Sequence, residues 1–360
     1  MARIISLANQ KGGVGKTTTS INLGASLAEL GARVLMVDFD PQGALSVGLG
    51  VNAQAFEQTI YNLLLDRSTL ISDVVVKTSA DGVDLLPGNI DLSAAEVVLV
   101  SEVAREQALK RALLPARDEY DFILIDCPPS LGLLTVNALT ASDGVIIPLE
   151  CEFFALRGMA LLVDTIEKVR DRLNPELQIE GVVATMYDPR TVHAREVLER
   201  VRDAFGARLF TSTIPRTIRF AEAPVVGQSI LNYASDSKGA QAYRRLAKEV
   251  LGIVDDETSH PAGSGGAVPD HLVAPPDAGA GSGAGGDAAR PGAGDPTATG
   301  DAASAGDPGG TVTVALHPVA LDSAPGGEAG SGVQGVAQPS SSPGEWQTAS
   351  RGESDVLLHP

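Results

Sequence analysis

The stretch Lys11-Gly-Gly-Val-Gly-Lys-Thr-Thr18 constrains the fold of this chain more than any other part of its sequence. It follows the apolar run 4–8, which predicts a short buried strand, and it precedes a helical pattern of apolar residues over 21–30. A strand, a glycine-rich turn and a helix in this order are the context of a phosphate-binding loop. The N–H groups of the turn and the N-terminus of the helix would then bind phosphate oxygens.

The residues of this loop indicate a nucleoside triphosphate with Mg²⁺. Lys16 would reach the β- and γ-phosphates, and the Thr17 hydroxyl would hold the metal ion. The usual pattern has a glycine where this chain has Gln10, and a second lysine, Lys11, opens the loop instead. Lys11 would supply charge for catalysis, either within the chain or across a dimer. The residues predicted to bind the nucleotide are Lys11, Gly12, Gly13, Val14, Gly15, Lys16, Thr17 and Thr18.

Two aspartates lie at or just beyond the ends of apolar runs, where open α/β sheets bind their ligands. Asp40 follows the run 33–38 and would position the attacking water; its alternative interpretation is a turn aspartate before proline. Asp40 faces the same crevice as the loop if the two strands are neighbours. Asp126 ends the run 121–126 and would order the water ligands of Mg²⁺. The predicted catalytic residues are Lys11, Lys16 and Asp40, and the predicted metal residues are Thr17 and Asp126.

Helical patterns alternate with buried apolar runs through residues 1–254. This alternation predicts an α/β fold of the three-layer P-loop NTPase class, with a mostly parallel sheet covered by helices on both faces. Between residues 44 and 120 we expect short strands at 74–76 and 83–86 and helices at 92–100 and 103–114.

Residues 255–360 have a different composition. They include 21 Gly and 12 Pro, and Trp346 is their single aromatic residue. Such a segment cannot bury enough apolar area to offset the entropy of ordering, so we predict a disordered tail. The tail is acidic, with 14 Asp and Glu against 2 Arg, out of a net charge of −18 for the chain.

One section of the chain has the opposite charge. Residues 186–254 carry 11 Lys and Arg against 7 Asp and Glu, which allows a local basic face although the whole chain is acidic. Arg190 and Arg219 lie in this section, on predicted loops or helix ends that suit phosphate contacts. No recognition motif or aromatic stacking array accompanies them, so sequence-specific DNA reading is not expected.

Six stretches resemble, in the same order, motifs of the ParA/MinD superfamily of deviant Walker A ATPases, and most closely its ParA (Soj-type) partition ATPases. The resemblance covers about residues 1–252 and leaves the tail uncovered. The stretches are KGGVGKTT (11–18), DFDPQG (38–43), IDCPPS (125–130), CEFFALRG (151–158), MYDPR (186–190) and IPR (214–216) through EAP (222–224).

The resemblance implies an ATPase that forms an ATP-dependent sandwich homodimer, in which Lys11 reaches the partner's nucleotide. Asp40 would activate water, Asp126 would support Mg²⁺, and Pro215 and Arg216 would lie near the base. Family members bind double-stranded DNA nonspecifically as ATP dimers. A ParB-type centromere-binding protein then stimulates hydrolysis, and the cycle moves replicated DNA apart.

The resemblance also bears on DNA contacts and on location. Arg190 and Arg219 occupy positions where family members carry DNA-contacting basic residues, although residues 191–195 differ from one common form of the family. We expect a cytoplasmic, nucleoid-associated protein: Met1-Ala-Arg leads directly into the first strand, and no apolar run reaches membrane-spanning length.

Three alternatives keep the same nucleotide chemistry. The first is positioning of a protein cargo, such as a flagellar or chemoreceptor cluster, which the sequence barely excludes. The second is a MinD-like regulator that cycles on membranes, which needs a basic amphipathic C-terminal helix; here the helical pattern at 238–251 runs into Asp255-Asp-Glu257. The third is an iron–sulfur carrier, although Cys127 and Cys151 occupy ordinary family contexts and suit reduced, partly buried thiols.

Overall fold

The computed structural model of the chain describes residues 1–152 and 155–253. In these residues the strands form one sheet in the order β3-β4-β2-β5-β1-β6-β7-β8, and every neighbouring pair is parallel except β3 with β4. The strands are β1 (Arg3–Leu7), β2 (Val34–Asp38), β3 (Val76–Lys77), β4 (Val83–Leu86), β5 (Phe122–Asp126), β6 (Gly144–Glu150), β7 (Gln178–Tyr187) and β8 (Leu209–Pro215).

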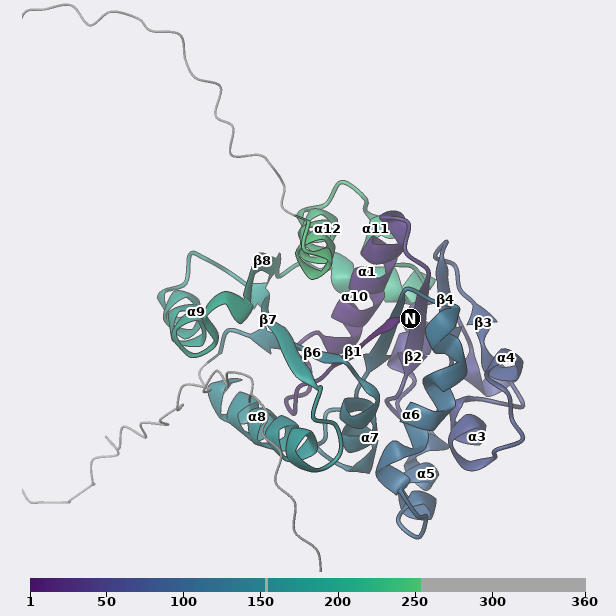
Figure 1. The fold of residues 1–360 in the computed structure, drawn as a ribbon. Helices are drawn as coiled ribbons and strands as arrows, with labels where there is room; N and C mark the ends of the chain where they lie inside the picture. The colour runs from purple at the N-terminus through teal and green to yellow at the C-terminus, as the bar shows by residue number, and fades with distance from the viewer. Residues whose placement is uncertain (153–154, 254–360) are drawn as a thin grey trace, which may run out of the picture. The chain divides into compact units, whose positions relative to one another are not determined.

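Helices connect these strands and cover both faces of the sheet (Figure 1). The predicted α/β fold class, with a mostly parallel sheet, is therefore confirmed. The α-helices are α1 (Lys16–Glu29), α2 (Ala44–Gly48), α3 (Ile60–Leu65), α4 (Ile71–Val74), α5 (Leu92–Leu99), α6 (Ala108–Leu113), α7 (Leu133–Ala141), α8 (Ala155–Arg172), α9 (Val192–Phe205), α10 (Arg219–Glu222), α11 (Ile230–Tyr233) and α12 (Lys238–Leu251). Short 3₁₀ segments lie at 53–55, 105–107, 114–118, 206–208 and 223–226.

Successive residues of the central strands point to opposite faces and build two apolar cores. Ile4 and Ile123 belong to one core, which residues of α3 and of α5 through α9 complete. Ile5 and Leu124 belong to the other, together with residues of α1, α2, α11 and α12. Burial on both faces explains why these strands are continuous apolar runs in the sequence.

The carboxyl ends of the central strands lie at one edge of the sheet. Asp38 at the end of β2 pairs in register with Asp126 at the end of β5, and Asp126 pairs with Leu7 at the end of β1. The loops that follow these three strands therefore begin side by side, which is where open α/β sheets bind ligands.

Two expected elements differ from the observed ones. The strand predicted at 74–76 is wrong, because Val74 ends α4 and the observed strand is Val76–Lys77. The helix predicted at 103–114 is broken, because Ala104 adopts a left-handed φ of 54° and regular α-helix begins only at Ala108. The predicted tail, 255–360, lies outside the described residues and stays a prediction.

Candidate nucleotide site

The turn between β1 and α1 has the shape of a phosphate-binding loop. Gly13 and Gly15 adopt φ angles of 77° and 84°, which residues with side chains rarely adopt. A Cβ built on Gly13 would have no heavy atom within 4 Å, so the loop is open there. Helix α1 begins at Lys16 with no side-chain cap and no acidic residue in its first turn, which leaves its N-terminal N–H groups available to an anion.

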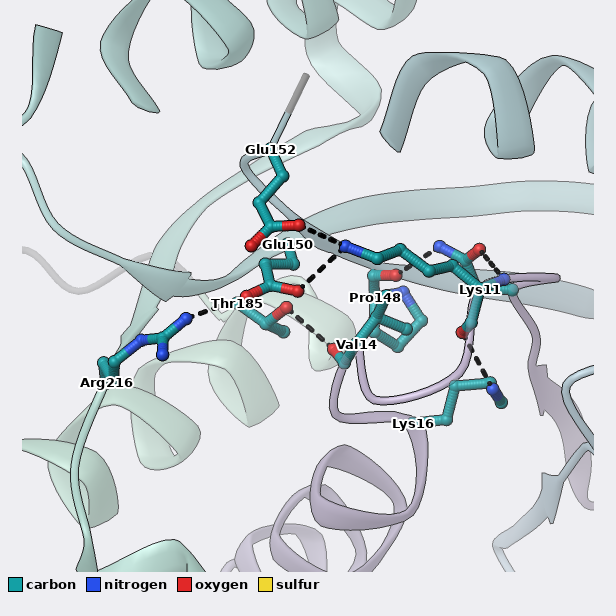
Figure 2. A network of polar contacts seen from close by, with 9 residues as sticks. Lys11, Val14, Lys16, Pro148, Glu150, Glu152, Thr185 and Arg216 are labelled. Atoms are coloured by element: carbon teal, nitrogen blue, oxygen red, sulfur yellow. Dashed lines mark hydrogen bonds and ion pairs between the residues drawn. The ribbon is translucent and has the colours of Figure 1, made fainter. Parts of the chain in front are cut away.

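Hydrogen bonds to strands β6 and β7 fix this loop (Figure 2). The Asn9 Nδ2 group donates to the Pro148 carbonyl at 2.8 Å, while Asn9 Oδ1 accepts from the Lys11 N–H at 3.0 Å. The Thr185 hydroxyl donates to the Val14 carbonyl at 2.8 Å. Strands β6 and β7 thus hold both sides of the loop through hydrogen bonds within the chain.

Lys16 lies inside the loop and is only 7% exposed. Its Nζ donates to the Lys11 carbonyl at 3.3 Å. Burial lowers the pKa of Lys16, and the charges of Asp126 and Asp40 oppose this change. A buried cation with one neutral acceptor would gain from a phosphate oxygen in its place.

Asp126 is fully buried beside the loop. Thr17 Oγ1 donates to its Oδ2 at 2.7 Å, and Ser20 Oγ donates to its Oδ1 at 2.9 Å. Burial raises the pKa of Asp126 to about 6 despite these two hydrogen bonds. The two predicted metal residues, Thr17 and Asp126, are therefore in direct contact.

Asp38 is a second buried carboxylate at this edge. Its Oδ2 accepts from the Ser46 N–H at 2.8 Å and from the Ser46 hydroxyl at 2.6 Å, whereas its Oδ1 is buried without a hydrogen-bond partner. Burial, with the charges of Asp126 and Asp40, raises the pKa of Asp38 to about 8. Gly88 packs so closely that a Cβ would lie 2.1 Å from the Asp38 carbonyl oxygen, so no larger residue fits there.

Asp40 lies just beyond β2, is 9% exposed, and accepts the Gln42 N–H at 3.0 Å. Its strand is not a direct neighbour of the loop's strand, because β5 lies between β2 and β1. Its carboxylate is nevertheless close enough for its charge to act on Lys16 and Asp126. The carboxyl edge, rather than direct strand pairing, brings Asp40 to the loop.

These residues fit Mg²⁺ bound together with a nucleotide. The charges of Asp126 and Asp40 act on one buried lysine, Lys16, and both also act on a third carboxylate, Asp38, whose Oδ1 is buried without a hydrogen-bond partner. Within the part of the chain that is described, no three His, Cys, Asp or Glu side chains are grouped to hold a metal by themselves. A Mg²⁺ ion that takes few protein ligands and completes its shell with phosphates and water matches this donor set.

The Lys11 side chain extends to Glu150 and Glu152 and forms two ion pairs (Figure 2). Its Nζ lies 3.1 Å from Glu150 Oε2 and 2.5 Å from Glu152 Oε2. Burial alone would lower the pKa of Lys11, but hydrogen bonds to Glu152 and Glu150 more than reverse this and raise it. Arg216 donates to Glu150 Oε1 at 2.8 Å and follows Pro215, the last residue of β8.

The two arginines predicted to contact DNA follow neighbouring strands at the same edge. Arg190 comes after β7 and Arg219 after β8, and Tyr187 pairs in register with Pro215. Arg190 forms an exposed ion pair with Asp188 at 2.7 Å, and this contact holds the pKa of Asp188 down at about 2. Because exposed pairs contribute little stability, a phosphate would compete readily for Arg190.

Two cysteines and one cavity contribute less to the nucleotide site than the residues described above. Cys127 and Cys151 are free and buried, and burial raises their pKa values to about 12 and about 11. A cavity of ≈ 530 Å³ opens near Arg33 and Gly82, at the amino ends of β2 and β4 and away from the loop. No helix among the described residues has the length and apolar character needed to cross a membrane.

Sequence reasoning missed three contributors to this edge: Glu150, Asp38 and Gly88. Glu150 and Asp38 each end a buried strand, so the rule that selected Asp126 would have found them too. Gly88 gives no such signal, because its role depends on a close approach to Asp38 that only the fold reveals.

Known proteins resemble this chain over most of the part that the structure describes. A family model described as an AAA domain matches residues 2–179. The sporulation initiation inhibitor protein Soj of Bacillus subtilis is 50% identical over 250 residues, which cover 69% of this chain and 98% of that protein. The chromosome partitioning protein ParA of Caulobacter vibrioides is 48% identical, over 69% of this chain and 94% of that protein.

Solved structures share the fold. A Mycobacterium smegmatis structure described as cobyrinic acid a,c-diamide synthase with bound ADP and magnesium is 43% identical and covers 70% of this chain and 94% of its own, with a TM-score of 0.62. The septum site-determining protein MinD of Pyrococcus horikoshii with Mg-ADP is 30% identical, over 69% of this chain and 96% of its own, with a TM-score of 0.57. By its extended identity to Soj and ParA, the chain belongs to the ParA/Soj family of P-loop ATPases.

Proposed function

We propose that this chain is a DNA-partition ATPase that uses ATP and Mg²⁺. The observation that carries the proposal is the arrangement at the carboxyl edge, where Lys16 and the Thr17–Asp126 pair meet an open glycine loop. The near-complete coverage of Soj and ParA supports partition as the process served.

The chain's own residues divide the work of hydrolysis. Loop N–H groups and Lys16 bind the phosphates, Thr17 and Asp126 hold Mg²⁺, and Asp40 positions the attacking water. The metal ion, when bound, neutralises charge that develops on the phosphate oxygens. Products are ADP and phosphate.

Dimerisation completes the site. In this structure Lys11 contacts Glu150 and Glu152 of its own chain. We assign it to the nucleotide of a second copy, where it would stabilise the transition state from the other side. By the family resemblance, Pro215 and Arg216 would lie near the base, and the ATP-bound dimer would be a sandwich with nucleotide at its interface.

The ATP dimer binds double-stranded DNA without sequence preference. Arg190 and Arg219 would contact phosphates, and they lie at the same sheet edge as the nucleotide loop, which lets nucleotide state influence them. A ParB-type centromere-binding protein would stimulate hydrolysis and release the dimer, giving a cytoplasmic protein associated with the nucleoid.

Of the three alternatives, positioning of a protein cargo shares every nucleotide-site feature and differs only in partner. Membrane cycling is disfavoured because the amphipathic helix α12 packs its apolar face on α1 and β8, through residues such as Tyr243 and Leu246. Iron–sulfur transport is disfavoured because Cys127 and Cys151 are buried thiols with raised pKa values.

An ATP-dependent DNA retention assay tests the proposal. The full chain is passed over immobilised nonspecific duplex DNA with ATP or ADP, with and without a candidate ParB-type protein. We expect retention with ATP alone, release and faster phosphate production when the partner is added, and little retention with ADP. Equal retention with both nucleotides, or none with either, would contradict the partition function.

A further inference from the structure

Glu150 is the buried centre of the polar network beside the nucleotide loop (Figure 2). Its Oε2 lies 3.1 Å from Lys11 Nζ, and its Oε1 lies 2.8 Å from an Arg216 nitrogen. Each carboxylate oxygen therefore contacts one cation. Lys11 lies 139 positions before Glu150 in the sequence, and Arg216 lies 66 positions after it. We propose that Glu150 is a positioning residue that retains Lys11 within its own chain and so opposes the ATP-dependent dimerisation for which Lys11 must be released.

This inference rests on the proposed function, in which Lys11 contacts the partner's nucleotide. In the structure Lys11 Nζ contacts two carboxylates of its own chain, Glu150 and Glu152. Lys11 must give up both contacts before it can reach a second copy. Because each copy donates one lysine, the intrachain contacts of Lys11 are broken in both copies for every dimer that forms.

The two carboxylates do not contribute equally. Glu152 makes the shorter contact, at 2.5 Å, but its side chain is 54% exposed, so water and salt compete with it. The Glu150 side chain is only 12% exposed, and Arg216 fixes its other oxygen. We give Glu150 the larger role, because a less solvated carboxylate that is already oriented attracts a cation more strongly.

The test measures self-association of the full chain by sedimentation with Mg²⁺ and a nonhydrolysable ATP analogue. Glu150→Gln keeps the shape of the side chain but removes its charge. We expect its dimer dissociation constant to fall by about fivefold, since two partly buried ion pairs are no longer lost on association. Glu152→Gln should shift it in the same direction by a smaller factor.

Glu180→Gln is the matched control, because it removes one charge from a half-buried ion pair with Arg3, far from the loop. It should leave the dissociation constant unchanged. A destabilised fold could only weaken association, so tighter association by Glu150→Gln cannot come from structural damage. Unchanged or weaker association of this variant would overturn the inference, whereas a wild-type chain that stays monomeric with the analogue would instead contradict the proposed function.

Discussion

Asp38 and Asp126 are buried carboxylates that this site must neutralise. Both have raised pKa values, about 8 and about 6, chiefly because burial disfavours their charged forms. Hydrogen bonds from Ser46, Thr17 and Ser20 offset only part of that cost. At the scale of single residues, burial opposes the charged forms of these two carboxylates, and Mg²⁺ with a nucleotide would favour them.

Stability of the metal-free chain should therefore depend on pH. Between pH 5 and 7 folded Asp38 keeps a proton that the unfolded chain has lost, so its contribution to the free energy of unfolding is present at low pH and is lost as pH rises toward about 8. Asp38→Asn keeps an acceptor for Ser46 but cannot titrate. Between pH 5 and 7 the free energy of unfolding of this variant should fall with pH less steeply than that of the wild type. The two slopes should differ by up to about 1.4 kcal/mol per pH unit.

Urea denaturation at several pH values, without nucleotide or metal, measures this difference. Glu102, an exposed acid away from the loop, gives a control variant, Glu102→Gln, whose pH dependence should follow the wild type. Parallel profiles for Asp38→Asn and the wild type would show that Asp38 is ionised normally in the folded chain.

At the scale of elements, neighbouring strands carry the nucleotide loop and the predicted DNA contacts to one edge. Arg219→Glu reverses an exposed charge beyond β8, so ATP-dependent DNA affinity should fall by about tenfold or more, with a shallower dependence on salt. Arg172→Glu is the matched control: it reverses an exposed charge where α8 ends, near the amino ends of the strands. Fluorescence anisotropy with a labelled duplex at several salt concentrations measures both. Equal losses in the two variants would remove the assignment of this edge to DNA.

Most of the elements could be predicted from sequence because their signals are local. The buried runs ending at Asp38 and Asp126 and the helical pattern of α12 reproduce the observed bounds within about a residue, whereas the pattern over 21–30 gives the end of α1 but not its start at Lys16. The strand predicted at 74–76 failed because α4 takes Val74, which β-branched composition alone does not reveal.

The order of the strands in the sheet and the contacts between distant residues could not be predicted from the sequence. No local pattern indicates that β5 lies between β1 and β2, or that Lys11 meets an acid 139 positions away at Glu150. The nucleotide loop could be recognised because its residues are consecutive. The network around Lys11 could not, because it depends on which strands become neighbours.

At the scale of the whole molecule, the packed cores extend from Ala2 to Val250, and Gly252 ends α12 in a left-handed conformation. We therefore predict that the folded unit is complete before the predicted tail begins. Deleting residues 256–360 should leave the thermal unfolding midpoint, ATP hydrolysis and DNA retention close to those of the full chain. A loss of folding would show that the tail completes a core.

A shorter chain supplies the comparison. Deleting from residue 238 onward also removes α12, which packs Tyr243 and Leu246 into the core beside α1. That chain should not fold cooperatively, because truncating a single large buried side chain already lowers the free energy of unfolding by about 2–5 kcal/mol. Calorimetry of the full chain and the two shortened chains shows which of them unfold cooperatively, and this distinguishes the two deletions.

The central claim is that Lys11 completes the site of a second copy, and mixing two inactive variants tests it most directly. Lys11→Ala lacks the lysine that would reach the nucleotide of the second copy, and Asp40→Ala lacks the carboxylate that positions water. Each variant alone should therefore hydrolyse almost no ATP. In a mixed dimer the Lys11→Ala copy keeps Asp40 and receives Lys11 from its partner. With mixed dimers verified by mass, we predict that hydrolysis in the presence of DNA is partly restored. A rate no greater than the sum of the separate variants would contradict the account.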